Sequence, residues 1–316
     1  MKLIIIIPAY NEAKTIARVI RGIPSAIPGV AEKEVVVIND GSFDDTVKVS
    51  REAGAQVVSH SKNLGLGVVF STGIKEALSR KGDLMVTIDA DGQFDHSDIS
   101  KLIQPIVNSE ADVVLGSRFM TSSPRLKMPA IKLIGNQLMS KFISMVCGQK
   151  FFDVSCGFRA YSKEALLNLN IFGKFTYTQE VILNLSFKNL TIKEVPISAE
   201  YFPERVSYIT GNLKKYVFNS LKIIFRTVLD YLPLRFFGLL GLVFFLAGLV
   251  LDIIMISIFW KTGQFSPYKS VGVFGLVLNA FGLILFVVGL VADMLGRIRH
   301  NQERIIYFQK KELYKK

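Results

Sequence analysis

Runs of apolar, β-branched residues alternate with helical patterns through the first part of the chain. Strands are predicted at Leu3–Ile7, Glu34–Ile38, Ala55–Ser59, Leu84–Ile88, Val113–Leu115 and Ile192–Ile197. Helices are predicted at Asn11–Ile23, Asp44–Ala53 and Leu66–Ser79. This alternation is typical of an α/β domain in which helices cover the faces of a sheet.

Two longer apolar runs follow at 236–260 and 271–295, and each provides the ~20 residues that an α-helix needs to cross a bilayer. Neither run is N-terminal, so neither is a signal peptide. We therefore predict a transmembrane hairpin over residues 234–295. Residues 211–233 combine a narrow polar stripe with a broad apolar face, a pattern that favours an amphipathic juxtamembrane helix.

The chain of 316 residues is strongly basic, with a formal net charge of +12. Lys and Arg gather just before the first span and in the tail at 296–316, whereas the loop between the spans holds only Lys261 and Lys269. The positive-inside rule then predicts a multi-pass protein of the cell membrane, with the domain at 1–210 and both termini cytosolic. The charge fits anionic lipid or phosphorylated ligands, and no nucleic-acid-binding motif accompanies it. Cys147 and Cys156 are expected to be reduced.

A pair of carboxylates follows one of the predicted strands. Asp89 and Asp91 lie one residue apart where the run Leu84–Ile88 ends, and Gln93 adds a neutral oxygen after the turn at Gly92. Mg²⁺ and Mn²⁺ prefer such oxygen ligands, and Mg²⁺ usually completes its coordination with water and substrate phosphates. By itself the triplet favours a solvated acidic turn, because short motifs match often by chance.

Other polar turns also follow predicted strands, at 8–12 and at 39–42. In open α/β sheets ligands bind beyond the carboxyl ends of the strands, so these turns are expected to converge on one ligand. Ordinary turn chemistry is the alternative for each of them. The chain has no G-x-x-x-x-G-K-[ST] loop and no complete dinucleotide fingerprint, which disfavours a P-loop ATPase or an NAD enzyme.

Six motifs, in this order, resemble those of family 2 glycosyltransferases, and specifically the polyprenyl-phosphate glycosyltransferases such as dolichyl-phosphate mannose synthases and undecaprenyl-phosphate sugar transferases. They are Pro8-Ala9-Tyr10-Asn11-Glu12, Asn39-Asp40-Gly41-Ser42, Asn63-Leu64-Gly65, Asp89-Ala90-Asp91-Gly92-Gln93, Gly116-Ser117-Arg118-Phe119 and Gly157-Phe158-Arg159-Ala160. The motifs cover about two thirds of the chain, and the hairpin extends the resemblance in architecture. Six motifs in order are specific, whereas any one alone is weak.

The resemblance implies a Rossmann-like GT-A fold and an inverting enzyme. Such an enzyme moves a sugar from a nucleotide-diphosphate sugar, with GDP or UDP as the nucleotide, to dolichyl or undecaprenyl phosphate. The lipid-linked product would serve glycan or cell-envelope assembly. The residues implied for the nucleotide sugar are Pro8, Tyr10, Glu12, Asp40, Asp89, Ala90 and, more weakly, Arg205. Asp89, Asp91 and Gln93 would hold Mg²⁺ or Mn²⁺ against the diphosphate, with Asp91, Arg118 and Lys132 central to the chemistry.

The acceptor phosphate is expected near helix 127–147, where the resemblance implies binding by Arg118, Lys132 and Asn136, with a weaker contribution from Ser207. Ile134, Leu138, Phe142 and Met145 share one face of this helix, and polar residues share another. Such a helix can lie at the membrane surface or pack into the core of the domain.

This chain departs from the family pattern at two positions. Many relatives have Asp where this chain has Asn39, which bears on recognition of the base. Many also have His where it has Phe94, which bears on the acceptor side. The alternatives are a processive polysaccharide synthase, whose Gln-x-x-Arg-Trp signature is missing here, and a non-catalytic scaffold or flippase partner that retains the fold. Glycines in the spans leave a homo-oligomer open.

Overall fold

The computed structural model describes residues 1–120, 130–171, 177–200, 222, 225, 229 and 231–315, without the side chains of residues 130–132. The chain divides into two compact units. The first comprises Met1–Ile224 together with Ile306–Lys316, and the second comprises Phe225–Ile305.

Seven strands of the described residues form one sheet in the order β3-β2-β1-β4-β6-β5-β7. The strands are β1 (Lys2–Ala9), β2 (Glu32–Asn39), β3 (Gln56–Ser59), β4 (Leu84–Thr87), β5 (Val113–Ser117), β6 (Arg159–Ser162) and β7 (Ile192–Pro196). Neighbouring strands are parallel except at β6, which runs antiparallel to both β4 and β5. The carboxyl ends of the other six strands therefore share one edge of the sheet, together with the amino end of β6.

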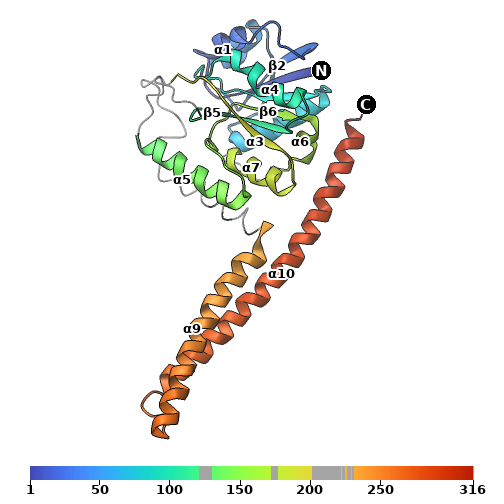
Figure 1. Cartoon of the computed structure of the whole chain (residues 1–316). Coiled ribbons are helices and arrows are strands. Elements are labelled where there is room, and N and C mark those ends of the chain that lie inside the picture. The colour runs from blue at the N-terminus through green and yellow to red at the C-terminus, as the bar shows by residue number, and fades with distance from the viewer. Residues whose placement is uncertain are drawn as a thin grey trace. The chain divides into compact units, whose positions relative to one another are not determined.

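Helices cover both faces of this sheet (Figure 1). The helices described between residues 1 and 200 are α1 (Ile16–Gly22), α2 (Thr46–Glu52), α3 (Leu66–Ser79), α4 (Ile99–Val107), α5 (Ala130–Cys147), α6 (Lys163–Asn168) and α7 (Thr178–Phe187), with a short 3-10 helix at His96–Asp98. Alternate residues of β1 point to opposite faces. Leu3, Ile5 and Ile7 belong to the core cluster that includes α1 and α4, whereas Ile6 packs against Gly73 of α3. Both sets are fully buried, as expected for a central parallel strand.

The second unit is built from α9 (Pro233–Thr262) and most of α10 (Lys269–Leu313), which lie side by side (Figure 1). Their most apolar windows have mean hydropathies of 2.8 and 2.6, and only 11% and 17% of these windows are buried. Core helices of a soluble protein would be mostly buried, so these two helices fit a membrane hairpin. Gly241 and Gly248 of α9 lie against Gly282 and Gly275 of α10, so these glycines serve contact within the chain.

The predicted strands are all present, and no bound differs by more than two residues. The first helix begins at Ile16 rather than Asn11, because Asn11 has a φ of 55°, outside the right-handed helical region. Strand β6 was not predicted. The amphipathic helix expected at 211–233 and the start of the one expected at 127–147 lie largely outside the described residues.

Candidate active site

The predicted motifs meet at the edge where the parallel strands end. The motif at 8–12 begins in the last two residues of β1, and the motif at 39–42 begins at the last residue of β2. The backbone amide of Asn11 donates to Ser42 Oγ at 2.9 Å, and that of Glu12 donates to Thr46 Oγ1 at 2.8 Å. These bonds join the first two motifs into one surface. Pro8, Tyr10 and Glu12, which are expected to contact the nucleotide, are partly exposed on it.

Asp40 holds a neighbouring loop in place. Its carboxylate accepts hydrogen bonds from the backbone amides of Leu64 and Gly65, at 3.0 and 2.9 Å. It also lies 2.8 Å from His60 Nδ1, and the other ring nitrogen of His60 is 3.0 Å from Thr72 Oγ1. Asp40 is only 4% exposed. The second and third motifs are therefore tied together through this one carboxylate, and its proposed contact with the base stays a prediction.

The carboxylates after β4 stand next to the Gly157 motif. A Cβ atom at Gly157 would lie 2.9 Å from Asp89 Oδ1. Thr87 Oγ1 also donates to the Gly157 carbonyl at 2.7 Å, which fixes the approach of the two segments. The Asp91 carboxylate accepts a hydrogen bond from the backbone amide of Gln93 at 3.0 Å, and this local bond stabilises the turn. Asp89, Asp91 and Gln93 are partly exposed, whereas Ala90 is buried.

Arg118 follows β5 and forms a two-pronged ion pair with Asp153. Its Nε atom is 2.7 Å from Asp153 Oδ2, and its Nη2 atom is 3.0 Å from Oδ1. Burial alone would raise the pKa of Asp153, but the guanidinium more than offsets this and lowers it. Burial likewise tends to lower the pKa of Arg118, whereas Asp153 and, more weakly, Asp89 raise it. Arg118 and the carboxylate after β4 thus share one electrostatic environment.

Helix α5 faces the domain with its polar side. Asn136 and Ser140 are 7% and 4% exposed, whereas Leu138 and Met145 are 66% and 71% exposed. The stripe that contains Leu138 and Met145 is thus exposed, which does not fit a core-packing helix, whereas Ile143 of the same helix is buried. The side chain of Lys132 and all of Arg205 and Ser207 lie outside the described residues. Their assignments, like that of Asn136, stay predictions.

The departure at Phe94 has a packing explanation. Phe94 is 6% exposed, and its ring centroid is 5.2 Å from that of Phe158. Asn39, the other departure, accepts the amide of Ser42 at 3.1 Å and donates to Ser59 Oγ at 3.2 Å. Both residues serve local structure at the site edge.

Three polar residues at the site had no role assigned from the sequence: His60, Asp153 and Ser155. A lone His and a polar loop resemble ordinary surface positions when only the sequence is considered. Asp153 and Ser155 lie in the segment Asp153–Tyr161, which the family resemblance places beside the sugar and acceptor without a role for either side chain.

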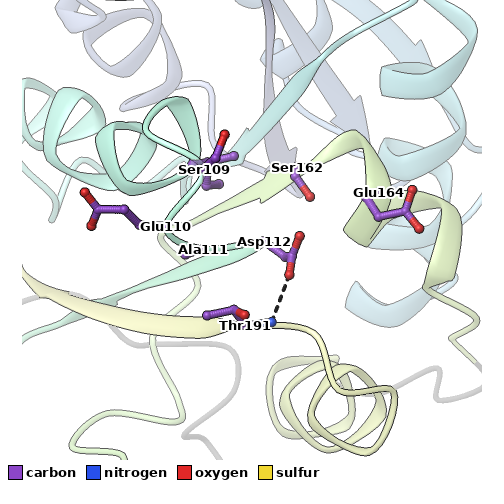
Figure 2. Close-up of a pocket in the computed structure, with 8 residues that line it drawn as sticks. Ser109, Glu110, Ala111, Asp112, Ser162, Glu164 and Thr191 are labelled. Carbon is purple, nitrogen blue, oxygen red and sulfur yellow. Dashed lines mark hydrogen bonds between the residues drawn. The ribbon is translucent and has the colours of Figure 1, made fainter.

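A cavity of about 220 Å³ lies at the opposite edge of the sheet (Figure 2). Asp112 and Thr191, which line it, immediately precede β5 and β7, and Ser162 ends the antiparallel strand β6. The amide of Thr191 donates to Asp112 Oδ2 at 2.9 Å. This cavity is therefore separate from the predicted motifs.

Known proteins share this sequence pattern. A dolichyl-phosphate N-acetylglucosaminyltransferase that uses UDP-N-acetylglucosamine, from Methanococcus voltae, is 34% identical over 217 residues, 62% of this chain and 85% of the relative. A polyprenol monophosphomannose synthase from Mycolicibacterium smegmatis is 27% identical over 72% of this chain and 88% of its own length.

Solved structures share the fold. Glucosyl-3-phosphoglycerate synthase from Mycobacterium tuberculosis, crystallised with Mn²⁺, UDP and phosphoglyceric acid, superposes with a TM-score of 0.56. It is 19% identical, and the match covers 72% of this chain and 78% of that one. The model of Glycosyl transferase family 2 matches residues 4–169, more than half of the chain. With its motifs gathered at one edge of a GT-A sheet, the chain belongs to glycosyl transferase family 2.

Proposed function

We propose that this glycosyltransferase moves a sugar from a nucleoside-diphosphate sugar to a polyprenyl phosphate, with inversion at the anomeric carbon. The observation that carries the proposal is the juxtaposition of Asp89, Gly157 and Arg118 at one sheet edge, with carboxylates for a metal-bound leaving group beside a cation for an incoming phosphate. The names of the relatives support the lipid phosphate acceptor.

The carboxylates after β4 fit a divalent cation. Among the described residues no group of three His, Cys, Asp or Glu side chains gathers as a metal cage. Two partly exposed carboxylates, Asp89 and Asp91, with Gln93 nearby, are instead the small ligand set that Mg²⁺ or Mn²⁺ accepts when substrate phosphates complete the shell. When bound, the cation neutralises the charge that develops on the departing diphosphate.

The chain's own residues then bind and orient the substrates. A phosphomonoester has a second pKa near 6, so the acceptor is largely anionic at neutral pH and needs no dedicated general base. Arg118, held by Asp153, offsets repulsion between the two phosphate-bearing substrates, with Lys132 assisting. Pro8, Tyr10, Glu12 and Asp40 line the nucleotide side.

Helix α5 offers a place for the lipid to approach. Its outward face presents Ile134, Leu138, Phe142 and Met145, with exposures of 38% to 71%. We propose that this face lies in the membrane interface, which brings the polyprenyl phosphate to the inner end of the acceptor site. The positive-inside rule separately predicts that the catalytic unit is cytosolic.

The test is transfer by the purified full chain. Protein, Mg²⁺ or Mn²⁺, polyprenyl phosphate and a panel of nucleotide sugars are incubated, and the lipid is analysed by mass spectrometry. We expect one donor to give a lipid heavier by one sugar. The Asp91→Ala variant should lose this product while it stays folded. Sugar-free lipid across a broad donor panel, or full turnover by Asp91→Ala, would contradict the proposal.

A chelator supplies a second readout of the same site. EDTA should stop transfer, and excess Mg²⁺ or Mn²⁺ should restore it, because the leaving diphosphate depends on the cation. Unchanged turnover in EDTA after prolonged dialysis would remove the metal from the proposal. The same experiment identifies which of the two ions supports the faster rate.

A further inference from the structure

A single hydroxyl connects helix α5 to Arg118. Ser155 Oγ lies 2.6 Å from Asn136 Oδ1 on α5. It also accepts a hydrogen bond from Arg118 Nη2 at 2.9 Å and lies 3.1 Å from Asp153 Oδ1. Asp153 is fully buried, and Asn136 is only 7% exposed. These four side chains therefore form one hydrogen-bonded cluster beneath the proposed acceptor site.

The segment that carries Ser155 is fastened on two sides. Glu194 of β7 accepts the amides of Phe152 and Asp153, at 2.8 and 2.9 Å. On the other side, Ser140 of α5 donates to the Phe152 carbonyl at 3.1 Å, and Ser144 accepts the amide of Phe151 at 2.8 Å. The backbone of residues 151–153 is thus anchored to both α5 and β7.

A hydroxyl has one proton to donate, and here two acceptors compete for it. The contact to Asn136 Oδ1 is the shorter of the two, at 2.6 Å against 3.1 Å to Asp153 Oδ1. If the Asn136 amide turns toward an acceptor phosphate, the Ser155 hydroxyl instead donates its hydrogen bond to Asp153. Arg118 keeps its bond to the hydroxyl oxygen in either arrangement.

We propose that Ser155 is a positioning residue that couples α5 to the Arg118 guanidinium, so that engagement of the lipid phosphate at the helix and alignment of Arg118 occur together. This inference rests on the proposed function, in which Arg118 meets the acceptor phosphate. Loss of the Ser155 hydroxyl should therefore weaken use of the acceptor and leave use of the nucleotide sugar unchanged. The reason is that the cluster lies on the proposed acceptor side of the carboxylates after β4.

The test compares Ser155→Ala with Ser144→Ala in steady-state transfer by the full chain. Both variants remove a hydroxyl that joins α5 and the 151–155 segment, but Ser144 has no bond to Arg118 or Asp153 among those the structure describes. Ser155→Ala should raise the KM for polyprenyl phosphate about ten-fold or more, the size expected when a hydrogen bond to a charged group is lost. The KM for the donor should stay within about two-fold of wild type. Ser144→Ala should leave both values near wild type.

Two further variants distinguish a positioning role of Ser155 from a purely structural one. Ser155→Thr retains the hydroxyl and should recover most of the acceptor KM. The effects of Ser155→Ala and Asn136→Ala should not add in the double variant, since both break the same link. Equal defects in Ser144→Ala and Ser155→Ala, additive effects, or a failure of Ser155→Thr to rescue would overturn the proposal. If Ser155→Ala does not fold, Ser155→Cys keeps the volume with a much weaker hydrogen bond and should show the same KM split.

Arg118→Ala separates a failure of the proposed function from a failure of the coupling through Ser155. A raised acceptor KM in Arg118→Ala with an unaffected Ser155→Ala would leave the proposed function standing and reject the coupling. An unchanged acceptor KM in Arg118→Ala would reject the acceptor assignment of Arg118, and the coupling with it. Transfer of sugar to lipid by the wild type tests the reaction itself, independently of both.

Discussion

Gly157 has no side chain, and this leaves room for the carboxylate of Asp89, a proposed metal ligand. The nearest atoms to a Cβ placed there are Oδ1 and Oδ2 of Asp89, at 2.9 and 3.2 Å. The backbone on the other side is held by Thr87, whose hydroxyl donates to the Gly157 carbonyl. Since the backbone is pinned, an added methyl group would push the Asp89 carboxylate.

We predict that Gly157→Ala lowers the transfer rate by up to about a hundred-fold, the loss that a reacting group misplaced by about 1 Å can cause. The metal concentration for half-maximal rate should rise as well. Turnover measured across a Mn²⁺ titration checks both. Gly238→Ala is the matched control, because a Cβ there meets no atom within 4 Å. Wild-type turnover by Gly157→Ala would show that the carboxylate accommodates the methyl group.

The Arg118–Asp153 pair also affects the pH dependence of stability. The pKa of Asp153 in the folded protein is lower than its ordinary value of 3.8, despite burial, because of the guanidinium. A carboxyl group with a lowered folded pKa stabilises the protein above the unfolded pKa, and this stability is lost as pH falls through the folded value.

We predict that Asp153→Asn is less stable than wild type by about 3 kcal/mol at neutral pH, because it leaves a largely buried guanidinium without its counter-charge. The difference should be constant between about pH 7 and 5 and should shrink below about pH 4. Thermal unfolding of both proteins in detergent from neutral to acidic pH measures it. A difference in stability that grows as the pH falls would contradict a lowered pKa of Asp153 in the folded protein.

Residues at the site differ in how far the sequence reveals them. Asp89 and Asp91 were identifiable because they follow the run Leu84–Ile88, which is apolar except for Thr87. Ser155 and His60 were not, since their roles depend on contacts with residues 19 and 12 positions away in the chain, Asn136 and Thr72. A hydroxyl or imidazole acquires such a role only when the fold brings its partners together.

At the scale of elements, the two apolar helices run antiparallel to each other, and both contain the sequence Gly-Leu-Val-Leu. Gly248-Leu-Val-Leu-Asp252 occurs on α9, and Gly275-Leu-Val-Leu-Asn279 occurs on α10. A Cβ at Gly248 would lie 2.6 Å from the Gly275 carbonyl oxygen, and one at Gly275 would lie 3.0 Å from that of Gly248. Asn279 Nδ2 donates to Asp252 Oδ2 at 2.5 Å. The repeat therefore sets the register of the hairpin through backbone contact and one polar bond.

We predict that Gly248→Leu destabilises the hairpin by about 1–3 kcal/mol, the usual range for overpacking, because the side chain has no room beside the Gly275 backbone. Val250→Leu, two residues away and 54% exposed, is the control and should have no effect. Melting in detergent can be followed by fluorescence of Trp260, the single tryptophan, near the end of α9. Equal melting of the two variants would argue against the close contact.

Most strands could be predicted because a strand buried on both faces appears as a continuous apolar run. Strand β6 could not, because its sequence Arg159-Ala-Tyr-Ser has a charged residue that becomes fully buried. Arg159 is satisfied by the carbonyls of Cys156, Thr178 and Val154, which only the tertiary fold provides. Helix α4 did have a signal, in Ile99, Leu102, Ile103 and Ile106, but Pro105 interrupts it.

At the scale of the whole molecule, charge and hydropathy together predict an orientation. The described α10 extends well beyond the apolar run at 271–295 to Leu313, so most of the basic tail is helical. Within the first unit, Lys310 of this tail donates to the Leu169 carbonyl at 2.7 Å. Residues 306–316 of the tail therefore belong to the same compact unit as the catalytic sheet, and both are expected on the same side of the membrane.

We predict that the loop between α9 and α10 is reached only from outside the cell and the tail only from inside, because Lys and Arg are retained on the cytosolic side. Cys147 is first replaced by Ser, and the buried Cys156 is kept. Single cysteines are then introduced as Gln264→Cys in the loop or Lys315→Cys in the tail. An impermeant maleimide should label Gln264→Cys in intact cells, and Lys315→Cys only after permeabilisation. The reverse pattern would place the proposed donor site on the side without nucleotide sugars, and the proposed function would fall with the orientation.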